Sequence, residues 1–394
     1  MNSRIESLKE KFRVAFPKAV PTVFSAPGRT ELGGNHTDHQ HGRVLCAAVN
    51  LDTLACAAVN GSNTIRIRSE GYAPFEIPAK FSAPTAEEFG TSAALVRGVV
   101  SRIIDLGYTV GGFDAYICSD VLPGSGLSSS AAFEVLIGTI INHFFCTDKL
   151  RPEEIAQIGQ YAENIYFGKP CGLMDQMASA VGGAVAIDFA DPATPIVRRI
   201  DFDFAASGCT LCIIDTRSEH GDLTEDYAAI TREMGLVAAH FGKEHLRDVD
   251  ENEFRTAISE IRQRCGDRAV LRALHFFAEN KRAALEAEAL EQGDFPRFLA
   301  LVNESGNSSA LLLENTWSPA EPRRQAVTLA LAIGKELLGG RGAIRVHGGG
   351  FAGTVQAFVP NDILTDFIAG MENIFGSGCC HALKVRSSGG KIEG

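Results

Sequence analysis

The sequence predicts a soluble two-domain protein of the α+β class. Its 394 residues exceed what one hydrophobic core usually organises, so two domains are expected. Strand-like segments dominate the first part of the chain, for example over residues 44–50, 53–59 and 64–68, whereas long helical patterns follow beyond residue 223. We place the boundary near residues 200–208, which divides the chain into residues 1–205 and residues 206–394.

The composition narrows the class of protein. Hydrophobic residues make up 45% and charged residues 22%, which is ordinary for a globular protein. The net charge of -11 argues against general nucleic-acid binding, and the longest apolar runs are too short to cross a membrane. The ten cysteines do not form a pair of CxxC motifs. The polar N-terminus lacks the pattern of a signal peptide. We therefore expect a cytoplasmic protein with reduced thiols, a monomer or weak dimer, without nucleic-acid or membrane partners.

The remaining elements follow from periodicity and turn signals. A helix is expected over residues 3–16, then a strand over residues 23–27 that ends in a polar loop over residues 28–42. Residues 387–394 are rich in Gly, Ser and Lys and are expected to form a loose tail. The other expected helices lie at residues 91–106, 151–166, 223–240, 252–264, 267–290, 295–303 and 320–338, and one more runs from the serines of residues 128–130 to about residue 145. The other expected strands lie at residues 113–118, 184–189 and 210–215 and within residues 343–359.

A glycine- and serine-rich loop, Pro123–Ala132, precedes one of these helices. The helix is indicated by apolar residues four apart, at Ala132, Leu136, Ile140 and Phe144. Unpaired backbone N–H groups and the positive end of a helix dipole meet at such a position and favour an anion. Three consecutive serines exceed what a single N-cap requires. The loop is therefore interpreted as a phosphate site, with an ordinary serine N-cap as the alternative.

Two other phosphate motifs are excluded. The chain has no GxxxxGK[ST] motif, so it is not a P-loop protein. Residues 348–353 match GxGxxG, but strand-like residues 354–359 follow instead of a helix, so the dinucleotide-binding context is missing. A tight glycine loop packed beside another element is the better interpretation.

The polar loop 28–42 allows three interpretations. His36, Asp38, His39 and His41 could hold a divalent metal, because imidazole and carboxylate are ordinary ligands. Alternatively, Arg29, Asn35, His36 and Asp38 could hydrogen-bond a substrate with many hydroxyl groups. A merely polar surface loop remains the third interpretation.

Four stretches of the chain together resemble the motifs of the GHMP kinases, and among them those of the galactokinases. Residues 26–38 resemble the galactokinase signature, and residues 121–132 the ATP-phosphate loop of the superfamily. Residues 168–176 are similar to the segment that carries the catalytic aspartate of galactokinases, and residues 345–353 to the third, glycine-rich motif. The order of the four stretches is that of the family and weakens the interpretation of the histidines as a metal site.

The resemblance implies a fold, a reaction and a set of site residues. It implies an N-terminal ribosomal-protein-S5-like domain, a C-terminal ferredoxin-like α/β domain, and ATP-dependent phosphorylation of a hexose C1 hydroxyl, most closely that of galactose. The implied catalytic pair is Asp175 as the base and Arg29 as its partner. Ser130 and Glu163 match Mg²⁺ ligands. The implied ATP loop consists of Pro123, Gly124, Ser125, Gly126, Leu127, Ser128, Ser129 and Ser130. The implied sugar ligands are Arg29, Asn35, His36, Asp38, Gly172, Asp175 and Tyr227.

The first motif departs from the galactokinase pattern at four positions. Glu31 stands where Asn is usual, Gly33 where Ile is usual, Asn35 where Glu is usual, and His39 where Tyr is usual. An amide at position 35 removes a negative charge and would tolerate a substrate carboxylate. A kinase for galacturonate or another modified hexose is therefore an alternative. A catalytically silent sensor of sugar and ATP is a second alternative, disfavoured by the intact serines, Arg29 and Asp175.

Overall fold

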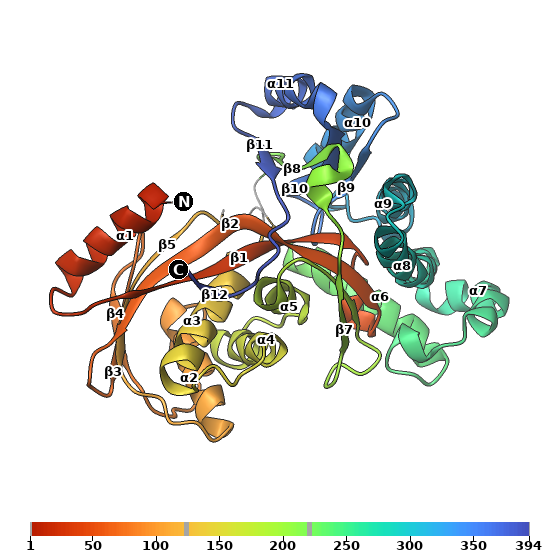
Figure 1. Cartoon of the computed structure of the whole chain (residues 1–394). Helices are drawn as coiled ribbons and strands as arrows, with labels where there is room; N and C mark the ends of the chain where they lie inside the picture. Colours follow the sequence, from red (N-terminus) through yellow and green to blue (C-terminus); the bar gives the residue numbers. More distant parts are fainter. Residues whose placement is uncertain (1, 122–125, 219–222, 394) are drawn as a thin grey trace.

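The chain folds around two sheets (Figure 1). The computed structural model describes residues 2–121, 126–218 and 223–393, and Pro123, Gly124 and Ser125 of the expected ATP loop lie outside these ranges. The architecture is α+β, as predicted, because strands that are mostly antiparallel alternate with groups of helices.

The first sheet has the strand order β12-β1-β2-β5-β3-β4, with β6 added beside β2 and β7 beside β6. All its pairings are antiparallel except that of β3 with β5. Its strands are β1 (Thr22–Gly33), β2 (Arg43–Val59), β3 (Thr64–Ser69), β4 (Phe75–Pro78), β5 (Phe113–Ser119), β6 (Ala184–Asp188), β7 (Ile196–Ile200) and β12 (Lys391–Glu393).

Helices cover both faces of this sheet. On one face, α1 (Asn2–Ala15) buries Leu8 and Phe12 against β1 and β2. The other face packs apolar side chains against four helices, α2 (Ser92–Asp105), α3 (Ser129–Phe145), α4 (Pro152–Tyr161) and α5 (Met174–Val181). A π-helical segment, η3 (Ala162–Phe167), continues α4.

The second sheet is antiparallel, with the order β11-β8-β10-β9. Its strands are β8 (Cys209–Asp215), β9 (Ala343–Val346), β10 (Thr354–Pro360) and β11 (Cys380–Leu383). The helices of this part are α6 (Thr224–His240), α7 (Glu251–Cys265), α8 (Asp267–Glu291), α9 (Phe295–Ser308), α10 (Ala326–Leu338) and α11 (Leu364–Phe375). A second π-helical segment, η6 (Ser309–Leu313), follows α9.

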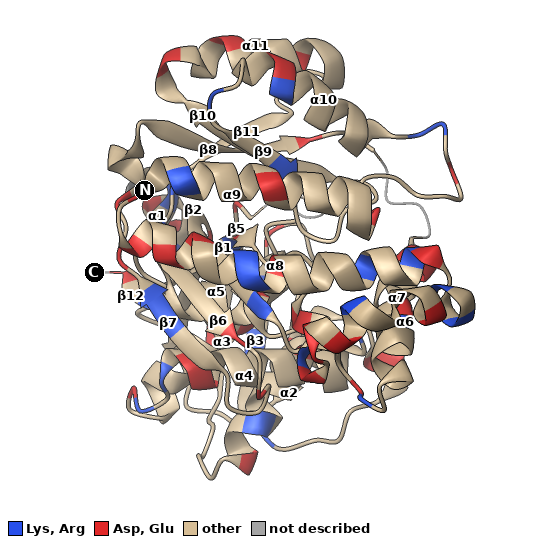
Figure 2. Cartoon of the chain, turned by 90° about the vertical axis from the view of Figure 1, so that its right-hand side faces the viewer, with Lys and Arg blue, Asp and Glu red and all other residues tan. Residues whose placement is uncertain are grey.

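Apolar side chains of α8 and α9 join the two sheets, because one hydrophobic cluster combines residues of these helices with residues of β1, β2, β8 and β10. Figure 2 shows α8 and α9 side by side, with acidic and basic residues interspersed on this side of the molecule. Among the described residues, no helix is both long and apolar enough to cross a membrane.

Several local predictions are wrong. The helix expected over residues 320–338 begins only at Ala326. The expected strands 44–50 and 53–59 form one continuous strand, β2, and β1 extends through Gly33 into the expected loop. Residues 391–393 of the expected loose tail pair with Val23–Ser25 of β1. The last strand therefore returns to the first sheet, although the predicted division places it with residues 206–394.

Candidate active site

A cavity of about 270 Å³ lies where the predicted motifs meet. Several elements contribute to its lining, from both sheets and the helices between them. The lining includes Arg29, Gly126, Ser128, Ser129, Ser130, Lys169, Asp175, Tyr227, His347, Gly348, Gly349 and Gly350. Among these residues are the predicted catalytic pair, most of the described ATP loop and one predicted sugar ligand, Tyr227.

The predicted catalytic pair is in direct contact. Arg29 Nε donates to Asp175 Oδ1 at 2.6 Å, and Arg29 Nη2 donates to Oδ2 of the same carboxylate. This bidentate geometry joins β1 to the first turn of α5. Burial alone would raise the pKa of Asp175, but the charge and hydrogen bonds of Arg29 outweigh it and lower the pKa below 3.8. Asp175 is therefore a carboxylate at neutral pH, and both it and Arg29 line the cavity.

The serine loop lies beside the Arg29–Asp175 pair in the cavity lining. Helix α3 begins at Ser129 after Ser128 with a left-handed backbone conformation (φ 55°), in agreement with the predicted helix start. Arg29 also binds this segment, because its backbone N–H donates to Leu127 O at 2.9 Å and its Nη1 donates to Gly126 O. Leu127 is fully buried in the apolar cluster between the sheets and does not line the cavity, so its role is to pack the loop.

The two predicted Mg²⁺ ligands meet at one edge of the site. Ser130 Oγ donates to Glu163 Oε1 at 3.1 Å, and Lys169 Nζ lies 3.5 Å from the same oxygen. Glu163 lies in η3, and π-helical segments are frequent at functional sites. Its other oxygen accepts from Gln176 Nε2 at 2.8 Å, which fixes the carboxylate. Among the described residues, no group of three or more His, Cys, Asp or Glu side chains could hold a metal ion, so the metal interpretation of the polar loop lacks the ligand cluster it requires.

The predicted sugar ligands divide into two groups. Tyr227 lines the cavity with Arg29 and Asp175. Asp38 and Gly172 contact each other outside that lining, since a Cβ on Gly172 would lie 2.3 Å from Asp38 Oδ2.

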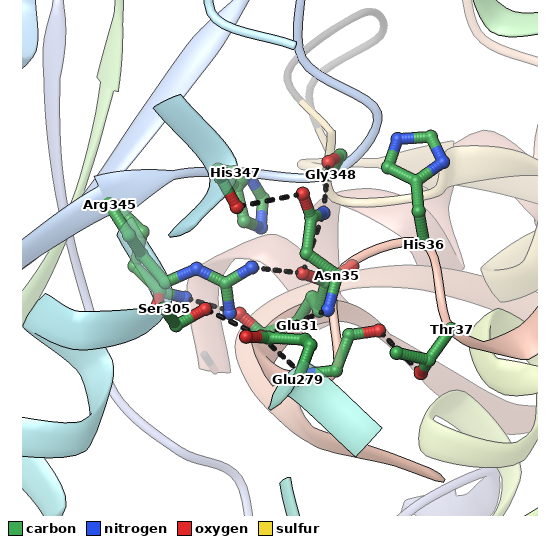
Figure 3. A network of polar contacts seen from close by, with 12 residues as sticks. Glu31, Asn35, His36, Thr37, Glu279, Ser305, Arg345, His347 and Gly348 are labelled. Carbon is green, nitrogen blue, oxygen red and sulfur yellow. Dashed lines mark hydrogen bonds and ion pairs between the residues drawn. The ribbon is translucent and has the colours of Figure 1, made fainter. Parts of the chain in front are cut away.

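His36 and Asn35 also lie outside the cavity lining. His36 Nε2 donates to Gly349 O at 2.8 Å, and burial next to His39 lowers the pKa of His36 to about 4. The imidazole is therefore neutral at physiological pH and carries its proton on Nε2. Figure 3 shows its ring directed away from the neighbouring polar network.

Asn35 is fully buried, and its amide makes four hydrogen bonds within the protein. Its Nδ2 donates to Glu31 Oε1 at 3.0 Å and to Gly348 O at 2.7 Å (Figure 3). Its Oδ1 accepts from Ser309 Oγ at 3.2 Å and from Asn315 Nδ2 at 2.9 Å. These four bonds use the whole capacity of a side-chain amide.

Two of the other departures in the first motif, Glu31 and Gly33, belong to the same buried region, whereas His39 is exposed. Glu31 forms an ion pair with Arg345 of β9, and both side chains are buried. Gly33 is required because a Cβ there would lie 1.5 Å from Glu286 Oε2 of α8. Glu279, also on α8, accepts from the backbone N–H groups of Gly34 at 3.1 Å and Asn35 at 3.3 Å. Glu31, Gly33 and Asn35 therefore fit one another and α8.

Sequence reasoning missed three contributors to this region. Lys169 supplies a second cation to the cavity, although its segment had been matched to the catalytic motif. Asn315, two residues after the end of η6, contacts Asn35, and no local pattern marks it. The three glycines after His347 line the cavity, and their place in the third motif was the available signal.

Comparisons with known proteins agree with these motifs. Residues 89–183 match the model of the GHMP kinases N terminal domain, and residues 10–59 match the galactokinase galactose-binding signature. A galactokinase from Lactococcus lactis, complexed with galactose, is 23% identical, with 99% of this chain and 100% of that chain covered and a TM-score of 0.82.

More distant structures share the fold. The mevalonate kinase of Methanococcus jannaschii is 15% identical over 94% of this chain and 99% of that chain, with a TM-score of 0.63. A Streptococcus pneumoniae phosphomevalonate kinase is 12% identical over 94% and 99%, with a TM-score of 0.62. The resemblance to the GHMP kinases is confirmed: this chain has their N-terminal domain, their fold over its length, and the galactose-binding signature of the galactokinases.

Proposed function

We propose that the protein is an ATP-dependent kinase that phosphorylates the C1 hydroxyl of galactose. The observation that carries the proposal is the Arg29–Asp175 pair, which lies in one cavity with the serine loop. The galactose-binding signature over residues 10–59 and the similarity to a galactose-bound galactokinase support galactose as the sugar.

Asp175 would accept the hydrogen of the C1 hydroxyl and aim its oxygen at the γ-phosphate of ATP. Its lowered pKa makes it a weak base, which suffices because phosphoryl transfer passes through a loose transition state with little deprotonation of the nucleophile. Arg29 keeps Asp175 ionised and adds positive charge close to the transferred group. Lys169, with a side chain 66% exposed, can turn toward the phosphates.

Ser128–Ser130 and the start of α3 would bind the ATP phosphates, together with the loop residues that precede them. Ser130 and Glu163 would hold Mg²⁺, because a hydroxyl and a carboxylate oxygen 3.1 Å apart suit a hard cation that keeps several water ligands. When bound, Mg²⁺ neutralises charge on the phosphates. Gln176 holds Glu163 in place for this role.

The contacts of Asn35 and of the Arg29–Asp175 pair bear on the two alternative functions, a galacturonate kinase and a silent sensor. The reason for considering galacturonate was that an amide at position 35, facing the sugar, would tolerate a substrate carboxylate. In the structure, however, Asn35 makes all four of its hydrogen bonds within the protein. That reason for galacturonate is therefore lost. A silent sensor is disfavoured because both Arg29 and Asp175 are present and paired in the cavity. We further propose that the protein is cytoplasmic and acts as a monomer or weak dimer.

The proposal is tested by ATP consumption with galactose, galacturonate, N-acetylgalactosamine, arabinose and glucose. We expect the highest kcat/KM with galactose. A higher kcat/KM with any other sugar of the panel would assign the substrate to that sugar, and ATP consumption with none of them would refute a hexose kinase.

A further inference from the structure

Four side chains hold three consecutive carbonyl groups in the loop between β9 and β10. Asn35 Nδ2 donates to Gly348 O at 2.7 Å. His36 Nε2 and Asn315 Nδ2 both donate to Gly349 O, at 2.8 and 3.1 Å. Tyr227 Oη donates to Gly350 O at 3.0 Å. The carbonyl groups of this glycine loop (residues 348–350) are therefore fixed by donors from the turn after β1, from α6 and from the segment after η6.

The N–H groups of the same loop face the other way. A trans peptide directs each carbonyl opposite to the N–H of the next residue. Because Gly348 O is directed at Asn35 and Gly349 O at His36 and Asn315, the N–H groups of Gly349 and Gly350 are directed away from these side chains. Neither N–H has a hydrogen-bond partner among the described residues, and both glycines line the cavity.

The backbone conformation of the loop fits an anion site. Gly348 and Gly350 have φ values of 66° and 83°, and Gly349 between them does not have a positive φ. Such alternation brings successive N–H groups onto one concave side, where they bind oxyanions. The same cavity is also lined by two cationic residues, Arg29 and Lys169.

We propose that the N–H groups of Gly349 and Gly350 bind nonbridging oxygens of the phosphoryl group during its transfer from ATP. Asn35, His36 and Asn315 are positioning residues that orient these N–H groups through the carbonyls of Gly348 and Gly349. The inference rests on the proposed kinase function and adds a role for Asn35 and His36, which the family resemblance had assigned to the sugar.

This role also accounts for the residue at position 35. The Gly348 carbonyl needs a donor, which an amide supplies and an ionised glutamate does not. Glu31, which stands where galactokinases usually have Asn, accepts the second amide hydrogen of Asn35 and forms an ion pair with Arg345. Compared with the usual galactokinase motif, Asn and Glu are exchanged between positions 31 and 35. This exchange places the amide donor of Asn35 next to the glycine loop.

The test compares ATP with ATPγS, in which sulfur replaces a nonbridging γ-oxygen and accepts hydrogen bonds poorly. In Asn315→Leu, the N–H of Gly350 is less well fixed, and we expect kcat with ATP to fall about tenfold or more. The ratio of the rates with ATP and ATPγS should fall with it, while the galactose Kd stays within about twofold. Asn307→Leu, at an exposed position on α9, is the matched control and should change neither ratio nor rate.

The proposal would be overturned if the ratio of the rates with ATP and ATPγS is unchanged in Asn315→Leu. It would also be overturned if the galactose Kd rises as much as kcat/KM falls. If Asn315→Leu does not fold, His36→Phe removes the other donor to Gly349 O, and the same ratio is measured. A sugar-independent readout separates this inference from the proposed function: the amide protons of Gly349 and Gly350 should move downfield when ADP, Mg²⁺ and aluminium fluoride are added. Unchanged shifts would refute the role of the loop even if galactose is phosphorylated.

Discussion

Two buried glutamates on α8, Glu279 and Glu286, are expected to respond oppositely to the same isosteric change. Glu279 accepts from Gly34, Asn35 and Ser305 and forms an ion pair with Arg282. Both oxygens of Glu286 are buried without a hydrogen-bond partner in the described structure. Glu279→Gln should therefore destabilise the protein strongly, whereas Glu286→Gln should not.

The magnitude for Glu279 follows from its pKa. Burial alone would raise the pKa, but His275, Arg282 and Arg345 outweigh burial and lower it from 4.5 to about 2. Because the folded state binds the proton less tightly, the resulting stability is present above pH 4.5 and is lost as the pH falls toward 2. At about 1.4 kcal/mol per pH unit, it amounts to about 3 kcal/mol at neutral pH.

Burial, and repulsion by Glu279, raise the pKa of Glu286 well above 4.5. A raised pKa favours folding below pH 4.5 and opposes it as the pH rises. The Gln variant removes that cost and should be as stable as the wild type at pH 7, or more stable.

The assay is urea unfolding at pH 7 and pH 4, followed by the fluorescence of Trp317, the only tryptophan. Glu279→Gln should lower the free energy of unfolding by about 3 kcal/mol at pH 7 and by less at pH 4. It should also raise the KM for the sugar, since Glu279 fixes the backbone at Gly34 and Asn35. Equal destabilisation by the two variants would refute the assignment of opposite charge states.

Three further predictions concern the site. Asp175→Ala should lower kcat by about 10³-fold or more while ATP still binds, because the acceptor of the C1 hydrogen is lost; near-normal turnover would contradict its role. Ser130→Ala should raise the Mg²⁺ concentration needed for half-maximal rate about tenfold, with galactose Kd as the control that stays unchanged. His36, whose pKa burial and His39 lower to about 4, should contribute to a loss of stability as the pH falls from 6.5 to 4, since only the unfolded state gains the proton there. His36→Gln should reduce this loss by up to about 3 kcal/mol in urea unfolding, and an unchanged pH dependence would show that His36 titrates normally.

The order of most helices could be predicted from the sequence, because their apolar periodicity is local. Helices α3, α6, α7 and α8 begin within about two residues of the predicted positions. Continuation of β1 through Gly33 could not be predicted, since Arg29, Thr30 and Glu31 look like loop residues. They are buried because Asp175, Gln356 and Arg345, which are distant in sequence, pair with them.

The candidate site was predicted in its chemistry and only partly in its geometry. The contact between Arg29 and Asp175 follows from motif resemblance, and the structure places the two side chains together. The environment of Asn35 depends on Ser309 and Asn315, which lie more than 270 residues further along the chain in segments without a recognisable pattern. Sequence alone therefore could not distinguish an Asn35 that faces the sugar from one that holds a loop.

The most direct test of a galactose 1-kinase is the position of the phosphate on the product. Purified protein is incubated with ATP, Mg²⁺ and [1-¹³C]galactose, and the C1 signal is followed by ¹³C NMR. We expect the signal to become a doublet through coupling to phosphorus, in the wild type and not in Asp175→Ala. A C1 signal that stays a singlet while ATP is consumed would contradict phosphorylation at C1.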